Sequence, residues 1–171
     1  MKNKNKFAEI LPYGVAGVYF LFLVWLILFK LADSIERIPS MRGINLIPFH
    51  YDEFSGTLFH WREVADNILV FIPAGFYLTA FYKGKFLSGL AASAVLSLSF
   101  EALQYVFALG ASDITDLITN TIGGCIGAGL FFLTGRLFKG RQVTVVSIIG
   151  AVLEALFVLL LIILIIGNMR T

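Results

Sequence analysis

Cysteine and charged residues are scarce in this sequence. Of its 171 residues, 14% are charged and one is a cysteine, Cys125. A single cysteine excludes an intrachain disulfide and makes a thiolate metal site implausible. The sequence has no basic stretch of the kind that binds nucleic acid and no low-complexity linker. We therefore expect no nucleic-acid partner and no second domain.

Motifs for cofactor-dependent and nucleophilic chemistry are also missing. The chain has no phosphate-binding glycine loop, no nucleophile motif and no dinucleotide fingerprint. Its two histidines, His50 and His60, lie near Asp52, Glu53 and Glu63, but their spacing fits no zinc motif. We expect no metal site and no cofactor.

Apolar residues are what the sequence has in excess. Hydrophobic residues make up 58% of the chain, and the mean hydropathy is +0.88, as in membrane proteins that cross the bilayer several times. A helix needs about 20 apolar residues to cross a bilayer. Five stretches are candidates: 11–32, 67–82, 87–109, 117–138 and 143–167. The second is the shortest and contains Pro73, so we expect it to kink, tilt little or borrow residues from its flanks. The sequence predicts an all-α fold, a bundle of five transmembrane helices forming one domain over residues 1–171.

Lys and Arg residues are unequally distributed between the segments that flank these stretches. With the N-terminus inside, eight basic residues lie on the inner side and five on the outer side. Two short basic turns, 83–85 and 139–141, both fall on the inner side. By the positive-inside rule, we predict a multi-pass protein of the cell membrane with a cytoplasmic N-terminus and an extracellular C-terminus.

Residues 33–66 form the one long segment outside the predicted spans, and this orientation puts the segment outside the cell. Phe54, Leu58, Trp61 and Ala65 recur within it at helical spacing. This pattern predicts a short amphipathic helix lying on the outer membrane surface. A loop packed over the bundle is the alternative.

Several acidic and amide residues stand inside the apolar stretches or at their ends, where they are costly and therefore candidates for function. Asp113, Asp116 and Asn120 are spaced i, i+3 and i+7, so they share one face of a helix. Capping of the helix N-terminus is the alternative role for the two aspartates. Glu101 and Gln104 present a carboxylate and an amide on one face of the neighbouring helix. For Glu101, a hydrogen bond to Asn120 that joins two helices is the structural alternative.

We expect the polar residues to converge on one outer pocket, because none of them is satisfied alone in hydrocarbon. The ligand-binding candidates are Asn45, Asn67, Glu101, Gln104, Asp113, Asp116 and Asn120. Apolar walls are expected from Phe49, Phe54, Trp61 and Phe71. The small-residue stripes expected to pack the third and fourth spans together are Gly89-Ser93-Ser97 and Gly123-x-x-x-Gly127.

Five short motifs follow one another across half of the chain. They are NLIPF at 45–49, NIL at 67–69 leading to FIPAGF at 71–76, ExxQ at 101–104, DIxD at 113–116, and NTIGG at 120–124 with Gly127. In this order they make residues 43–129 similar to the VanZ-like family, whose core we expect over 43–138. The resemblance implies an integral membrane protein of the cell envelope associated with reduced susceptibility to the lipoglycopeptide teicoplanin. It implies no catalytic mechanism. Members often carry a basic residue and an aromatic just ahead of the first aspartate, where this chain has Gly-Ala-Ser at 110–112.

A repeated spacing suggests an internal duplication. Asn67 precedes Glu101 by 34 positions, and Asn120 precedes Glu154 by the same number. A shift of 53 positions relates the two pairs, and both glutamates open the tripeptide Glu-Ala-Leu. The stretch 143–167 would then be the end of a second half, related to the first by an axis along the membrane normal. Coincidence between apolar helices is the alternative.

Three functions fit these features. The favoured one is a non-enzymatic envelope protein whose partner is a membrane lipid, a lipid-linked cell-wall component or an acylated glycopeptide. The second is a membrane enzyme acting on a lipid-linked substrate, with Glu101, Asp113 and Asp116 as its catalytic candidates. The third is a small transporter, supported by the repeat and by Glu154 within the membrane.

Overall fold

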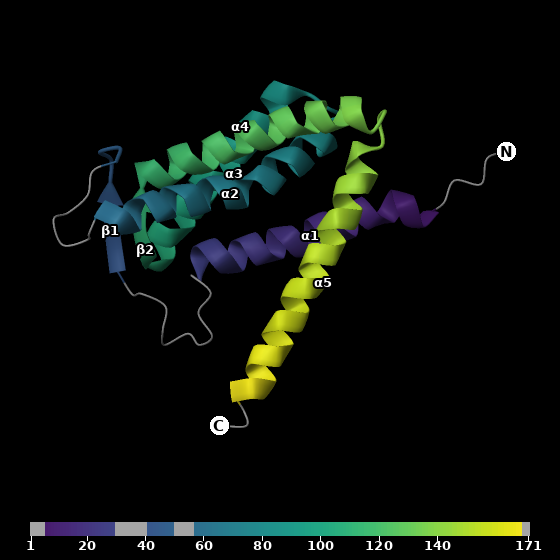
Figure 1. Ribbon diagram of the computed structural model, residues 1–171. Coiled ribbons are helices and arrows are strands. Elements are labelled where there is room, and N and C mark those ends of the chain that lie inside the picture. The colour runs from purple at the N-terminus through teal and green to yellow at the C-terminus, as the bar shows by residue number, and fades with distance from the viewer. Residues whose placement is uncertain (1–5, 30–40, 50–56, 169–171) are drawn as a thin grey trace.

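The computed structural model describes residues 6–29, 41–49 and 57–168. In chain order its elements are α1 (Lys6–Leu28), β1 (Met41–Asn45), α2 (Thr57–Phe81), α3 (Phe86–Phe107), β2 (Leu109–Asp113), α4 (Ile114–Leu137) and α5 (Gln142–Asn168). All five helices are long and apolar enough to cross a membrane (Figure 1). The predicted all-α fold with five membrane-spanning helices is therefore confirmed.

The second helix differs most from its predicted span. It begins at Thr57 rather than at residue 67, and the part that is apolar enough to span the membrane is Trp61–Phe81. The prediction of a separate surface helix is wrong from Thr57 onward, and Phe54 lies outside the described residues. The physical reason is that no glycine or proline occurs between Thr57 and Pro73, so nothing breaks the helix. These added turns give the predicted short span its full length.

Three helices form the centre of the bundle. Helices α2, α3 and α4 lie side by side, with α2 packed most extensively against α4 (Figure 1). Helix α1 packs against this group and against α5. Helix α5 leaves the end of α4 through a tight turn and diverges from the group (Figure 1). The central group therefore carries most of the helix–helix contacts.

Glycines allow the close approach of α2 and α4. A Cβ atom on Gly127 would lie 2.0 Å from the carbonyl oxygen of Ile72, and Gly123 faces α2 in the same way. The predicted packing role of this glycine pair is confirmed, but its predicted partner, α3, is wrong. Helix α3 instead approaches through Ser93, whose Cβ would lie 2.5 Å from a Cβ on Gly124. Gly123 and Gly127 of α4 thus face α2, whereas Gly124 faces α3.

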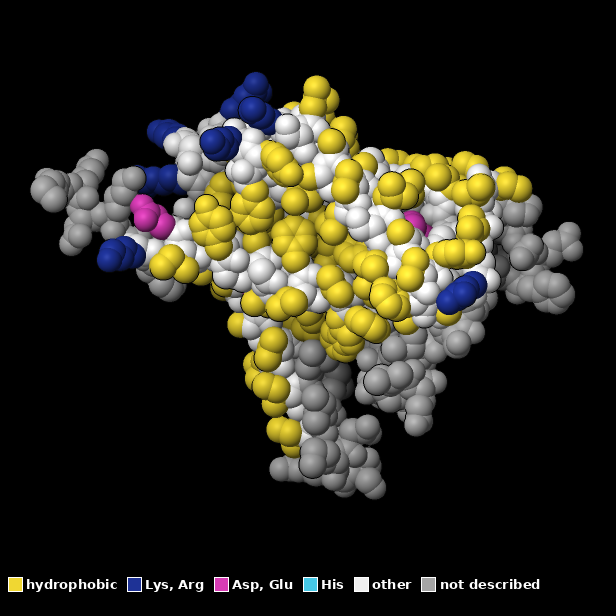
Figure 2. Space-filling view, turned by 180° about the vertical axis from the view of Figure 1, so that it is seen from behind, with side chains coloured by type: hydrophobic (Ala, Val, Ile, Leu, Met, Phe, Trp, Pro, Cys, Tyr) yellow, Lys and Arg dark blue, Asp and Glu magenta, His cyan; other side chains and the backbone are white. Residues whose placement is uncertain are grey.

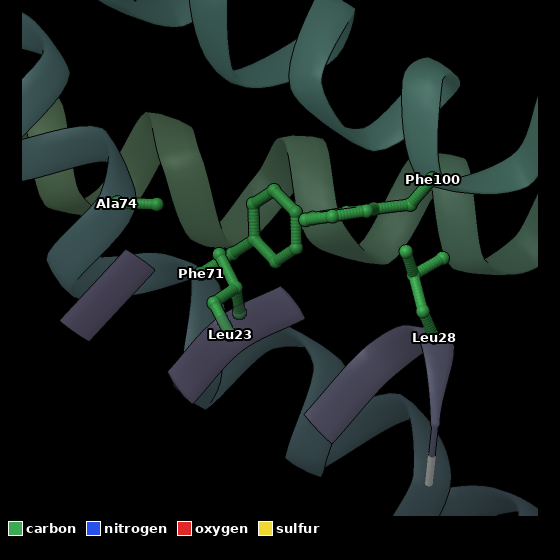
Figure 3. Close-up of a cluster of buried hydrophobic side chains, with 5 residues drawn as sticks. All are labelled: Leu23, Leu28, Phe71, Ala74 and Phe100. Atoms are coloured by element: carbon green, nitrogen blue, oxygen red, sulfur yellow. The ribbon is translucent and has the colours of Figure 1, made fainter. Parts of the chain in front are cut away.

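A buried apolar cluster joins α1, α2 and α3. Phe71 and Phe100 meet edge to face, with ring centroids 6.3 Å apart (Figure 3). Leu23, Leu28 and Ala74 complete the buried set. The cluster lies near the C-terminal ends of α1 and α3, next to the polar residues of α3 described below.

A small parallel sheet, which the sequence analysis did not predict, lies at one end of the bundle. Strand β1 pairs with β2 in a register that sets Gly43 opposite Ala111 and Asn45 opposite Asp113. A Cβ on Gly43 would lie 3.2 Å from the Cβ of Ala111, so small residues keep this pair close. The sheet fixes the entry of the chain into α4.

The two basic turns lie at the opposite end of the bundle from the strands. Each ends its helix with a glycine in the left-handed region, Gly84 at φ +72° and Gly140 at φ +83°. The N–H of Gly84 donates to the carbonyl of Thr79, and that of Gly140 donates to Gly135, a helix-ending pattern that a positive φ permits. Lys and Arg side chains gather at this end, while apolar side chains cover much of the surface between the ends (Figure 2).

Candidate functional site

Glu101 ties the C-terminal half of α3 to the start of α4. Its Oε2 atom accepts a hydrogen bond of 2.8 Å from the backbone N–H of Asp113. The hydroxyl of Ser112 donates to the backbone carbonyl of Glu101 at 2.6 Å. Only 6% of the surface of Glu101 is exposed. This acid therefore holds the β2–α4 junction against α3 from within the membrane-spanning part of the chain.

Asp113 is the N-cap of α4. One carboxylate oxygen accepts from the backbone N–H of Thr115 at 2.7 Å, which confirms the capping alternative for this residue. The other oxygen accepts from the side-chain amide of Asn45 at 3.0 Å, across the paired strands. Where members of the resembled family often have a basic residue just ahead of this aspartate, the partner here is a neutral amide. Asp113 thus connects the strand pair to the helix.

Asp116 lies on another side of α4. Its Oδ1 accepts a 2.7 Å hydrogen bond from the side-chain amide of Asn67 in α2. Gln104 is 5% exposed and donates from Nε2 to the backbone carbonyl of Ile27 at 3.2 Å. These contacts join α1, α2, α3 and α4 at the same end of the bundle.

Asn120 is buried one turn deeper in α4. Its side-chain amide donates to the hydroxyl of Ser97 in α3 at 3.0 Å. Asn120 is 2% exposed, and its Oδ1 has no hydrogen-bond partner. The hydrogen bond between Asn120 and Glu101 that the sequence analysis gave as an alternative is therefore not formed, and Asn120 bonds instead to Ser97, four residues before Glu101. The partner of Asn120 that sequence reasoning missed is Ser97, although the small-residue stripe did include it.

The polar residues gather at one end but not in one pocket. Three of the seven ligand-binding candidates line a cavity of about 260 Å³, here called the outer cavity. Its lining is Ile44, Asn45, Leu46, Leu98, Glu101, Ala102, Tyr105, Ser112, Asp113, Ile114 and Leu117. Three others line a second cavity of about 210 Å³, here called the acidic cavity. Its lining is Leu26, Ile27, Glu63, Asp66, Asn67, Val70, Gln104, Ala111 and Asp116. Asn120 lines neither, so the prediction of a single pocket is wrong.

The reason for the division is the helical position of each side chain. Asp113 precedes the first turn of α4 and faces the strands, whereas Asp116, three residues later, faces α2. Glu101 and Gln104 are separated in the same way on α3, since only Glu101 reaches the outer cavity. Residues three apart are neighbours on a helix without facing the same cavity.

The predicted aromatic walls are not found in either cavity. Phe71 is fully buried in the apolar cluster of Figure 3. Trp61 and Phe49 are exposed, and neither lines a cavity described above. Phe54 lies outside the described residues. The apolar lining of the outer cavity comes instead from Tyr105 and from aliphatic residues of α3, α4 and the β1 region. Leu46 and Ile114 belong to the motifs NLIPF and DIxD, whereas Leu98 and Leu117 belong to no motif.

A larger cavity lies elsewhere among the described residues. It measures about 820 Å³ and is lined by residues of α1, α2 and α3, with no acidic or basic residue among them. Like the outer cavity, it is open along its wall, where side chains such as Val95 and Ser99 are exposed. The two smaller cavities carry the polar groups.

Metal ligation finds no support in the described residues. Among residues 6–29, 41–49 and 57–168, no group of three or more His, Cys, Asp or Glu is arranged to hold a metal ion. His50 lies outside the described residues. Asp116, Glu101 and Asp113 each accept a hydrogen bond described above.

Comparison with known proteins identifies the relatives of this chain. The sequence profile of the VanZ/LLP1 family matches residues 16–139. The chain is also 40% identical over 157 residues to Protein VanZ of Enterococcus faecium, an alignment covering 90% of this chain and 92% of that protein. No solved structure matches the chain. The family match includes the strands, both cavities and helices α2 to α4, and the chain belongs to the VanZ/LLP1 family of membrane proteins.

Proposed function

We propose that this protein binds an acylated or lipid-linked envelope ligand at the outer leaflet, and that this binding lowers susceptibility to teicoplanin. The observation that carries the proposal is the outer cavity, whose sides are apolar and whose end is a carboxylate–amide group. Membership of the VanZ/LLP1 family supports it, because the family resemblance implies an association with teicoplanin. Teicoplanin carries an acyl chain that vancomycin lacks.

The chemistry of the cavity suits such a ligand. Leu98, Ala102 and Leu117 come from spans α3 and α4, so an acyl chain in contact with them stays within the hydrocarbon depth of the membrane. Asn45 and Asp113 lie at the strand pair and offer an amide and a carboxylate to a polar head group. Apolar burial supplies affinity, and the few polar groups orient the ligand.

Binding is better supported than catalysis by the arrangement of the acids. The carboxylates of Glu101 and Asp113 accept hydrogen bonds from backbone N–H groups, which stabilise the local fold. Asp116, the third catalytic candidate, lines the other cavity. An enzyme that uses the three acids together would need a rearrangement of the β2–α4 junction. The transporter alternative has less support, since these cavities and their acids lie toward one end of the bundle.

We also propose that the strand end of the bundle faces outward and the N-terminus faces the cytoplasm. The gathering of basic side chains at the opposite end supports this orientation (Figure 2). Single cysteines introduced in a Cys125→Ser background test it. A membrane-impermeant maleimide added to intact cells is expected to label position 46, where Leu46 is 72% exposed, but not positions 85 or 141. Labelling at 85 without labelling at 46 would reverse the proposed orientation.

The function is tested by filling the outer cavity. Ala102→Leu adds apolar volume at an exposed lining position of α3, so the variant is expected to fold and to exclude an acyl chain. Leu103→Phe is the matched control, because Leu103 is exposed on the same helix and lines neither cavity.

The measurement is the minimal inhibitory concentration of teicoplanin and of vancomycin in a susceptible host that expresses each variant at equal level. We expect the wild type and the control to protect against teicoplanin more than against vancomycin, and Ala102→Leu to lose that difference. Equal protection against both drugs, or full protection by Ala102→Leu, would contradict the proposal.

A further inference from the structure

The cavity of about 820 Å³ between α1, α2 and α3, here called the side groove, follows one face of α3. Its lining runs from Ser88 to Phe100 on that helix, or along about 18 Å of helix axis at 1.5 Å per residue. This part of α3 belongs to a span that is apolar enough to cross the membrane. The side groove therefore has the direction and the depth of an acyl chain in one leaflet.

Small side chains on α3 account for the hollow. Aromatic residues hold α1 against α2, since Tyr13 stacks on Phe81 with ring centroids 5.7 Å apart and Tyr19 lies 6.4 Å from Tyr77. On α3, the side groove is lined by alanines at positions 91 and 92, which leave the space beside α1 unfilled. Water is disfavoured in such an apolar hollow, because a bound water needs two to four polar partners. Within a bilayer, an acyl chain is the favoured occupant.

Positive charge lies at one end of the side groove. Lys83 and Lys85 stand in the chain between Tyr82 and Ser88, which both line the side groove. Both lysines are exposed, and neither forms an ion pair within the part of the chain that the structure describes. This end of the bundle is where basic side chains gather (Figure 2). Among the described residues, the acid at this end is Glu9 on α1. A ligand that pairs an acyl chain with a negative head group matches both features.

We propose that the side groove holds an acyl chain of an anionic phospholipid whose phosphate lies at Lys83 and Lys85. Lysines close to the membrane surface attract anionic lipids. A second copy of this chain in the same orientation would bring its own basic turns to the same depth, and like charges placed side by side repel. Charge therefore favours a phospholipid over self-association as the occupant.

This lipid site is separate from the proposed acyl-ligand site. The side groove shares no lining residue with the outer cavity. It also extends from the basic turn 83–85, whereas the outer cavity lies at the strand pair. Either proposal can therefore fail without the other.

The first test measures thermal unfolding of the purified protein in detergent micelles by circular dichroism. A ligand that binds only the folded state raises the unfolding midpoint. We expect dioleoylphosphatidylglycerol to raise the midpoint in a saturable manner. Dioleoylphosphatidylcholine, which has the same chains and no net charge, should raise it much less. Equal stabilisation by the two lipids, or none by dioleoylphosphatidylglycerol, would overturn the proposal.

The two basic turns supply a matched pair of variants. Lys83→Gln combined with Lys85→Gln is expected to raise the half-saturating mole fraction of dioleoylphosphatidylglycerol about tenfold or more, the factor for losing one hydrogen bond to a charged group. Lys139→Gln combined with Arg141→Gln is the control. It removes the same charge from a turn of the same conformation, with φ +50° at Lys139 and +57° at Lys83, and that turn contributes no lining residue. Equal losses in the two double variants would show unspecific attraction to the basic end and overturn the assignment.

A third variant tests the place of the acyl chain. Ala91→Phe fills the side groove from an exposed position of α3 and should weaken the effect of dioleoylphosphatidylglycerol by a similar factor. Ala155→Phe, at an exposed position of α5 outside the side groove, should not. An undiminished effect in Ala91→Phe would overturn the proposal. So would a dimer, detected by light scattering in micelles, that Ala91→Phe disrupts. If Ala91→Phe fails to fold, the lysine variants at the exposed turn still decide.

Discussion

The helix pairs α2–α3 and α4–α5 begin in the same way and end differently. Both pairs turn through a basic residue and a glycine with positive φ. Helix α3 then packs back along α2, whereas α5 diverges from α4 (Figure 1). The arrangement thus gives the suggested duplication no support beyond the two turns, and the turns alone do not decide the angle at which two helices pack.

Side-chain size at the start of the second helix accounts for the difference. A Cβ on Gly89 of α3 would lie 2.1 Å from Thr79 Oγ1, so glycine is needed for the close approach. The turn glycines Gly84 and Gly140 are 56 positions apart rather than 53. This separation puts Val145 where Gly89 stands and Gly135 where Thr79 stands. The side chain of Gln142 occupies the space beside Gly135. Helix α5 therefore cannot close onto α4 as α3 closes onto α2.

The largest expected difference concerns apolar burial. Phe100 of α3 is 3% exposed within the cluster of Figure 3. Leu153 of α5, which lies 53 positions later, is 61% exposed. We expect Phe100→Ala to lower the free energy of unfolding by about 3 kcal/mol, the low end for such a change, because detergent rather than water receives the unfolded apolar surface. Leu153→Ala should have little effect. Thermal or denaturant unfolding in micelles measures both, and equal losses would refute the contrast between the pairs.

The glycine explanation is tested next. Gly89→Ala forces the α3 backbone away from Thr79 and is expected to cost about 1–3 kcal/mol, as overpacking does. Gly129→Ala is the control, because an added Cβ there meets nothing within 4 Å. That control should be neutral or slightly stabilising, since alanine has the higher helix propensity. If both variants unfold alike, close packing at Gly89 is not what holds α3 to α2.

Glu101 and Glu154 allow the two helix pairs to be compared for function. Glu101 is buried and bonded to the Asp113 N–H, whereas Glu154 lines an apolar cavity of about 300 Å³ between α1 and α5. Glu101→Gln keeps an oxygen to accept that hydrogen bond and removes the charge. We expect it to reduce protection against teicoplanin more than Glu154→Gln does, at equal expression, as measured by minimal inhibitory concentration. The reverse order would move the functional site to α5.

Some of this arrangement was predictable from sequence. The five spans follow from length and hydropathy. The predicted bounds match α3, α4 and α5 closely because the basic turns 83–85 and 139–141 mark one end of each of these helices. The start of α2 was missed because Thr57–Asp66 is polar enough to resemble a surface segment while containing no helix breaker. Local composition does not show whether a polar helix continues into a span.

The sequence predicts which residues form the candidate site better than it predicts how they are arranged. Polar residues in apolar spans signalled Glu101, Asn120 and their neighbours. Their division between two cavities depends on the strand pair, which turns Asp113 toward Asn45. Five-residue strands such as MRGIN and LGASD carry no alternating apolar pattern, so nothing in the sequence predicts their pairing.

The smallest expected difference concerns single hydrogen bonds between helices. Ser97 accepts from Asn120 at 3.0 Å inside the central group, and Ser147 of α5 pairs with Tyr77 at 3.3 Å. Hydrogen bonds between membrane helices are worth about 0.6 kcal/mol on average. The loss of stability caused by Ser97→Ala should exceed this value. The substitution leaves both polar atoms of the buried Asn120 amide without a hydrogen bond, and the closely packed helices α2, α3 and α4 leave no room for them to rearrange.

Ser147→Ala should fall at or below the average, because α5 is held to the central group by few contacts and its release costs little else. Unfolding midpoints of the two variants in the same detergent measure the difference. A larger loss for Ser147→Ala would mean that α5 is an integral part of the cooperative unit. Helix α5 would then unfold together with the central group even though it points away from it.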